Sequence, residues 1–119
     1  MQEIEAYQAG TVTAQNKGRL IVLLYDGAIK FMTLAIKELE ANNDEAKERY
    51  INKALDIIKE LDVILSVNTG DEMASNLRKL YCVMTKQLAE ANIKCDPQII
   101  QGVIKLVEEL NQSWKAISI

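Results

Sequence analysis

The sequence predicts an all-α protein: an antiparallel up-down four-helix bundle preceded by an irregular segment. Apolar residues recur at helical spacing over four stretches of about 20 residues, as buried helix faces require. The loops between these stretches are short, which favours antiparallel neighbours. The chain of 119 residues has one Pro, five Gly and 49% hydrophobic residues, which is typical of a single helical domain over residues 1–119.

The first 15 residues show no sustained helical period. Three apolar residues, Ile4, Tyr7 and Val12, stand among polar residues and Gly10. We interpret residues 1–15 as a strap that lies on the body of the protein through these three anchors. Residues 16–119 then form the bundle.

The first long helix is expected to begin at Asn16, as its N-cap, and to end near residues 42–44. At about 100° per residue, its polar side chains collect in one narrow stripe (Asp26, Lys30, Thr33, Lys37). An apolar face lies opposite that stripe (Leu24, Ala28, Phe31, Ala35, Leu39). Both flanks are apolar as well, one with Tyr25, Ile29, Met32 and Ile36, the other with Leu20, Leu23, Gly27 and Leu34.

This apolar arc is about twice as wide as a surface helix needs. The extra flank, on which we place Tyr25, is open to three interpretations: cover by the strap, contact with a second copy, or binding of an amphipathic segment of another protein. Gly27 costs up to about 1 kcal/mol relative to Ala inside a helix. We therefore expect its missing side chain to allow the close approach of a neighbouring backbone.

Three further helices follow. The second is expected over residues 45–67 and the third over 71–92, with Asp71 suited to the positive end of the helix dipole. Asp96 as N-cap and Pro97 at the first helical position mark the start of the fourth. The predicted inner faces are Tyr50, Ala54, Ile57, Ile58, Leu61 and Leu65; Met73, Leu77, Leu80, Tyr81, Met84, Leu88 and Ala91; and Ile99, Val103, Val107, Leu110, Trp114 and Ile117.

Composition excludes several classes of function. A net charge of −3 argues against nucleic-acid binding, and no apolar run reaches the length of a membrane span. The polar, acidic start is unlike a signal peptide, so we expect a cytoplasmic protein whose two cysteines are reduced and partly buried. The chain has no histidine and no glycine-rich phosphate loop, so we expect no cofactor, no metal and no enzymatic activity.

Several segments, taken in order, resemble the FliS family of flagellar secretion chaperones. No single segment is specific, but their order is, and together they span nearly the whole chain. One departure lies at residues 13–19, where TAQNKGR replaces a Thr-Ala-Ser-Pro-like entry to the first long helix. The matching segments are AYQ (6–8), VTA (12–14), LIVLLYDGAIKF (20–31), KALDIIKEL (53–61), SNLRKLY (75–81), LAEANIKCD (88–96) and ELNQSWK (109–115).

The resemblance implies a non-enzymatic cytosolic chaperone. Such a protein binds the disordered C-terminal region of flagellin, prevents its premature polymerisation and keeps it competent for export by the flagellar type III apparatus. The client folds into helices along apolar grooves, and the strap covers part of its site and moves aside. The candidate flagellin-binding residues are Tyr7, Tyr25, Ile29, Met32, Ile36, Asn76, Leu77 and Asn92.

Each candidate residue also has an ordinary structural interpretation. The apolar ones can be bundle contacts, and Asn76 and Asn92 can form local caps or interhelical hydrogen bonds. The alternative function is a structural or regulatory helical-bundle dimer without a flagellin client. We expect a monomer or a weak homodimer that also meets the flagellar export apparatus.

Overall fold

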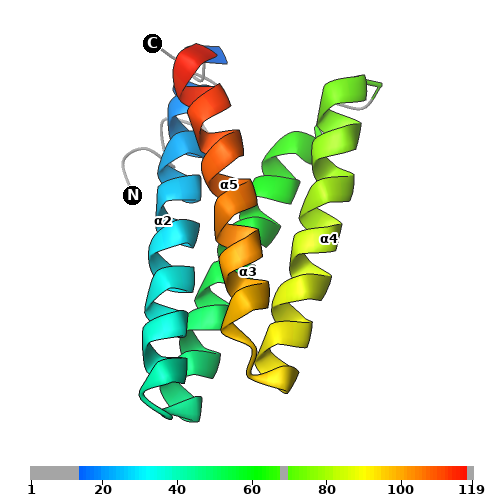
Figure 1. Ribbon diagram of the computed structural model, residues 1–119. Helices are drawn as coiled ribbons and strands as arrows, with labels where there is room; N and C mark the ends of the chain where they lie inside the picture. The colour runs from blue at the N-terminus through cyan, green and yellow to red at the C-terminus, as the bar shows by residue number, and fades with distance from the viewer. Residues whose placement is uncertain (1–13, 68–69, 118–119) are drawn as a thin grey trace.

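A computed structural model describes residues 14–67 and 70–117 (Figure 1). Its helices are α2 (Ala14–Glu40), α3 (Asp44–Ser66), α4 (Glu72–Lys94) and α5 (Pro97–Ile117). α2 packs beside α3 and α5, and α4 packs beside the same two, so consecutive helices run antiparallel around a ring. The predicted antiparallel four-helix bundle is confirmed. The strap anchors Ile4, Tyr7 and Val12 lie outside the described residues.

Two tight turns close the lower end of the bundle as drawn in Figure 1. After α2, Asn42 adopts a left-handed conformation with φ of 61°, and the Asn43 amide donates to the Glu38 carbonyl at 2.9 Å. This pairing satisfies carbonyls that the helix end leaves free. The Asn43 side chain then accepts the Ala46 amide at 3.2 Å and caps α3.

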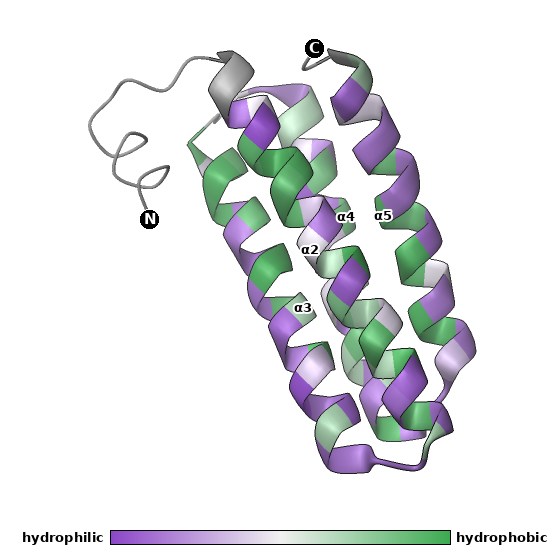
Figure 2. Ribbon diagram, turned by 90° about the vertical axis from the view of Figure 1, so that its left-hand side faces the viewer, coloured by the Kyte–Doolittle hydropathy of each residue, from purple (hydrophilic) through white to green (hydrophobic). Residues whose placement is uncertain are grey.

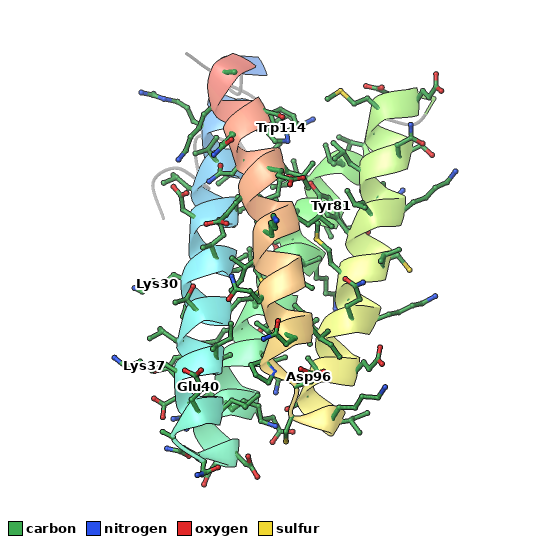
Figure 3. All side chains as sticks on the ribbon, viewed as in Figure 1. Lys30, Lys37, Glu40, Tyr81, Asp96 and Trp114 are labelled. Atoms are coloured by element: carbon green, nitrogen blue, oxygen red, sulfur yellow. The ribbon has the colours of Figure 1, made fainter. Side chains whose placement is uncertain are left out.

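The turn between α4 and α5 repeats this arrangement. Cys95 is left-handed, with φ of 53°, and the Asp96 amide donates to the Ala91 carbonyl at 3.3 Å. Asp96 Oδ1 accepts the Gln98 amide at 2.9 Å. Asp96 as N-cap and Pro97 at the first helical position are thus confirmed, and Figure 3 shows Asp96 at this lower junction.

α2 starts at Ala14, two residues before the predicted start. Asn16 therefore lies within the first turn, and its predicted role as N-cap is wrong. Ala14 and Gln15 are good helix formers, so nothing in the local sequence stops the helix at Asn16. Helix ends are also the part of a fold that local sequence determines least.

The orientation of α2 differs from the predicted one in part. The polar stripe is exposed as expected, and Figure 3 shows Lys30 and Lys37 pointing away from the bundle. However, Tyr25 and Met32 have no exposed surface, while Leu24, on the predicted inner face, is only partly buried. Tyr25 and Met32 thus belong to the core, and the placement of Tyr25 on an extra flank outside the bundle contacts is corrected. Almost every position of α2 outside the polar stripe is apolar. The hydrophobic pattern alone therefore could not show which side of the helix faces the core.

A buried lysine joins α3 to the end of α4. Lys47 is only 4% exposed, and its Nζ donates to the Asn92 backbone carbonyl at 2.9 Å. Cys95 Sγ lies 3.5 Å from the same nitrogen. Both cysteines are free, and both are exposed rather than partly buried as expected, Cys95 because it occupies the turn.

Candidate binding site on α4

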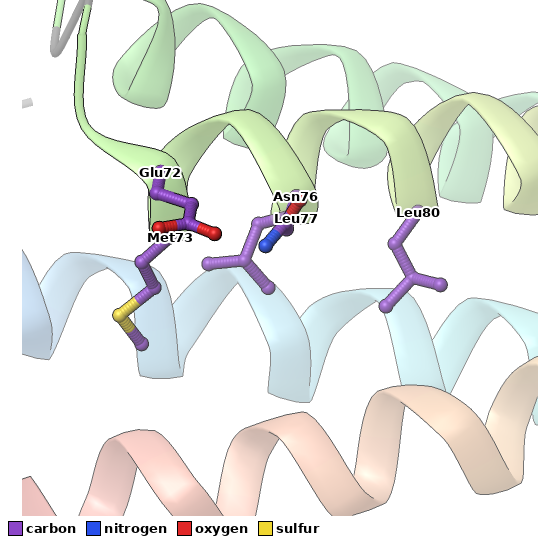
Figure 4. Close-up of a pocket in the computed structure, with 5 residues that line it drawn as sticks. All are labelled: Glu72, Met73, Asn76, Leu77 and Leu80. Carbon is purple, nitrogen blue, oxygen red and sulfur yellow. The ribbon is translucent and has the colours of Figure 1, made fainter.

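An apolar pocket lies along the N-terminal part of α4, at the upper end of the bundle (Figure 4). Its volume is about 530 Å³. Met73, 55% exposed, leaves the apolar lining accessible from outside, whereas Leu77 is nearly buried. The lining residues are Glu72, Met73, Asn76, Leu77 and Leu80. We call this feature the α4 pocket.

Local sequence explains how α4 presents these side chains. Asp71 Oδ1 accepts the Met73 amide at 2.9 Å and the Ala74 amide at 3.5 Å, so Asp71 is the N-cap that fixes where the helix begins. Met73, Leu77 and Leu80 then follow at intervals of four and three, which places them on adjoining parts of one helix face. Figure 1 shows α4 diverging from α5 toward this end.

Beneath this region two buried tyrosines meet. The hydroxyls of Tyr25 on α2 and Tyr81 on α4 lie 2.6 Å apart and share a hydrogen bond. Burial raises the pKa of the Tyr25 phenol above its ordinary value, and the hydrogen bond with Tyr81 opposes that rise. Burial, together with the nearby Tyr25, raises the pKa of Tyr81 as well. Both phenols therefore stay neutral at physiological pH, and Figure 3 shows Tyr81 and Trp114 between α5 and α4.

Of the predicted client-binding residues that the structure describes, two lie in the α4 pocket. Asn76 and Leu77 share the α4 pocket. Asn92 lies 16 positions further along α4, which at 1.5 Å per residue is about 24 Å away. Ile29 and Ile36 are partly buried against the core, whereas Tyr25 and Met32 belong to it.

The sequence-based list missed Glu72, Met73 and Leu80, which also line the pocket. A signal for two of them was present, because Met73 and Leu80 belong to the predicted apolar stripe of this helix. Periodicity could not show that Met73 stays exposed. That exposure depends on the distance between α4 and its neighbours.

Exposed apolar side chains also occur on α2, on α3 and directly after α3. Leu23 is 57%, Val63 54% and Val67 71% exposed. Figure 2 shows the dense apolar run near the N-terminal end of α2, to which Leu23 belongs. A Cβ added to Gly27 would lie 3.2 Å from Ile57 Cδ1 on α3. The neighbour is thus the end of a side chain, and the expected approach of a neighbouring backbone is wrong.

A polar contact joins α2 to α5 on the outer side. Asn111, itself buried, donates from Nδ2 to Asp26 Oδ1 at 2.7 Å. Lys115 Nζ lies 3.8 Å from the same oxygen, with both side chains about half exposed. Asp26 therefore anchors α5 rather than forming part of a catalytic pair.

Within 14–67 and 70–117, no three acidic or cysteine side chains gather where they could hold a metal ion. None of the four described helices is long and apolar enough to cross a membrane.

Comparison with known proteins supports the resemblance to the FliS family. The family model described as "Flagellar protein FliS" matches residues 1–119. The flagellar secretion chaperone FliS of Vibrio cholerae is 32% identical over 118 residues, which cover 96% of this chain and 87% of that protein. FliS of Bacillus subtilis is 34% identical, with coverages of 92% and 81%, and FliSB of Pseudomonas aeruginosa is 34% identical, with coverages of 99% and 97%.

A match over the full length, supported by relatives above 30% identity, leaves one assignment. The chain belongs to the FliS family of flagellar secretion chaperones.

Proposed function

We propose that this protein is a cytoplasmic chaperone that binds the disordered C-terminal region of flagellin. It prevents premature polymerisation of flagellin and keeps it competent for the flagellar type III export apparatus. Family membership supports this role, and it accounts for the expectation that the protein is not an enzyme. The α4 pocket is the observation that carries the proposal for the site.

The chemistry of the pocket suits one face of an amphipathic segment. Its apolar lining from Met73, Leu77 and Leu80 removes apolar client side chains from water, at about 25 cal/mol per Å² of buried apolar area. Asn76 and Glu72 at the rim supply polar groups for the client backbone or for basic side chains. This arrangement corresponds to binding of a helix in a groove.

The pocket alone is too small to hold a long segment. A disordered client loses conformational entropy when it orders, so useful affinity requires a large contact area. We therefore propose that the client extends beyond the pocket over other apolar surface, with Ile29 and Ile36 as further contacts. We propose that Tyr25 and Met32 support this surface from the core, and that Asn92 marks its far end.

The strap completes the proposal. Ile4, Tyr7 and Val12 would cover part of the client surface in the free protein and leave it when flagellin binds. In that arrangement one chaperone, as a monomer or weak homodimer, binds one flagellin.

Isothermal titration with a C-terminal flagellin fragment tests the proposal. Met73→Glu places a charge at an exposed apolar position of the pocket, and we expect it to weaken binding at least about tenfold, because burying a Met side chain contributes about 1.5–3 kcal/mol. Lys86→Glu is the matched control, since Lys86 is also exposed on α4 but lies outside the pocket and six positions before Asn92. No binding of the wild-type protein at micromolar concentration would refute the function. An equal loss of affinity for the flagellin fragment in both variants would refute the α4 pocket as the binding site.

One alternative, a structural or regulatory helical-bundle dimer, is favoured by three exposed apolar residues: Leu23 on α2, Val63 on α3, and Val67 directly after α3. That alternative predicts a mass that rises with concentration in light scattering and indifference to flagellin. A constant monomer mass together with flagellin binding would exclude it.

A further inference from the structure

α4 is enclosed unevenly along its length. Toward the lower end, Leu88 and Ala91 have no exposed surface, whereas Leu77 retains 8% and Met73, one turn earlier, 55%. Figure 1 shows the divergence of α4 from α5 in the same direction. The upper half of α4, which carries the α4 pocket, is therefore its least enclosed part.

Different contacts hold the two halves. At the lower end, the buried Lys47 binds the Asn92 carbonyl, and the tight turn at Cys95 fixes α4 to α5. In the upper half, Arg78 pairs with Asp62 of α3 at 2.9 Å, but both side chains are exposed. Exposed ion pairs of this kind contribute little stability. A buried polar contact carries more weight there.

That contact is the hydrogen bond between Tyr25 and Tyr81. It joins α2 to α4 across the ring, although each of these helices packs along α3 and α5 rather than along the other. Tyr25 is fully buried and Tyr81 is 1% exposed, so the bond of 2.6 Å is shielded from water. Tyr81 directly follows Leu80 and lies one turn after Leu77, so its position constrains both pocket residues.

We propose that the Tyr25–Tyr81 hydrogen bond holds the upper half of α4 toward α2 and so sets the shape of the α4 pocket. The two tyrosines are then positioning residues that the bound segment does not touch. For the identity of that segment, and only for that, the inference rests on the proposed function. Losing the bond lowers the fraction of molecules with the binding shape, and the apparent affinity falls by the same factor.

The test uses the full chain with Tyr25→Phe and Tyr81→Phe combined. Removing both hydroxyls leaves neither one buried without a partner, so the bundle is expected to fold. Tyr50→Phe is the matched control, because Tyr50 lies on α3 with its ring stacked on Phe31. Amide hydrogen exchange is measured by mass spectrometry in the absence of client.

In the double variant, amides of residues 73–81 should exchange about fivefold faster, the factor expected from the net loss of one hydrogen bond. Amides of α2 and α5 should keep their rates, and Tyr50→Phe should leave all rates unchanged. Uniformly faster exchange, or unchanged exchange at 73–81, would overturn the inference, because the first would mean a general loss of stability and the second no positioning.

The flagellin fragment then measures the consequence for binding. Its apparent affinity for the double variant should be weaker than for the wild type or Tyr50→Phe, by at most about fivefold, because the affinity follows the fraction of molecules with the binding shape. Faster exchange with unchanged affinity would also overturn the inference. If the wild type itself failed to bind, the proposed function would be refuted, and the exchange rates at 73–81 would decide on the tyrosine pair by themselves.

Discussion

Replacing Lys47 with methionine tests whether a buried charge stabilises the lower end of the bundle. Lys47 is 4% exposed, and its Nζ donates to the Asn92 carbonyl at 2.9 Å. That carbonyl lies in the last turn of α4, where the helix itself supplies no amide for it. Methionine keeps the apolar contacts of the lysine stem and removes the donor.

The expected magnitude follows from two opposing effects. A hydrogen bond from a charged donor contributes about 1.5–3 kcal/mol. Relief from burying the ammonium offsets part of that loss. We expect Lys47→Met to lower the free energy of unfolding by about 1–2 kcal/mol. For 119 residues the unfolding entropy is about 0.25 kcal/mol/K, so Tm should fall by about 4–8 °C.

Thermal and urea unfolding followed by circular dichroism measure this change. Lys59→Met is the matched control, because Lys59 is an exposed lysine of the same helix, and it should change stability by less than about 0.5 kcal/mol. If Lys47→Met proved as stable as the wild type, or more so, the reasoning would be wrong. Burying the ammonium would then cost at least as much as its hydrogen bond contributes.

Two further predictions concern Gly27 and the buried tyrosines. Gly27→Ala should stabilise the protein in urea by up to about 1 kcal/mol, because Ala favours the helix and Ile57 Cδ1, the end of a flexible side chain, can move from 3.2 Å; a clear loss would show that Ile57 is fixed. Above pH 10, stability should fall by up to about 1.4 kcal/mol per pH unit for each of Tyr25 and Tyr81, because their raised pKa values keep them protonated only in the folded state. Unfolding between pH 7 and 11 checks this, and an equal fall in the Tyr25→Phe/Tyr81→Phe variant would contradict it.

Much of the fold could be predicted from local sequence. The four helices and the caps at Asp71 and Asp96 were predictable because periodicity, cap residues and a proline act within a few positions. The start of α2 could not be predicted in this way. Ala14 and Gln15 are good helix formers, so the helix includes them and does not begin at the possible N-cap Asn16.

The parts that could not be predicted depend on distant partners. From the sequence alone, Lys47 is expected to be an exposed surface lysine. In the fold, the end of α4 lies beside it, and Lys47 donates to the free backbone carbonyl of Asn92. In the sequence, Asn111 is a polar residue with no evident partner. In the fold, it donates a hydrogen bond to Asp26, 85 positions away. For the site, the family motif identified Asn76 and Leu77, but which apolar residues stay exposed beside them depends on how far α4 lies from its neighbours.

The distribution of exposed apolar residues argues for an unfolded client over a folded one. Met73 and the α4 pocket lie on one helix, whereas Leu23 lies on α2, which does not pack against α4. A rigid partner with a single flat surface would contact one of these regions and leave the other exposed. A disordered segment can follow the surface from one region to the next and order as it binds. The proposed flagellin segment has this property, and comparing Met73→Glu with Lys86→Glu tests whether its path includes the α4 pocket.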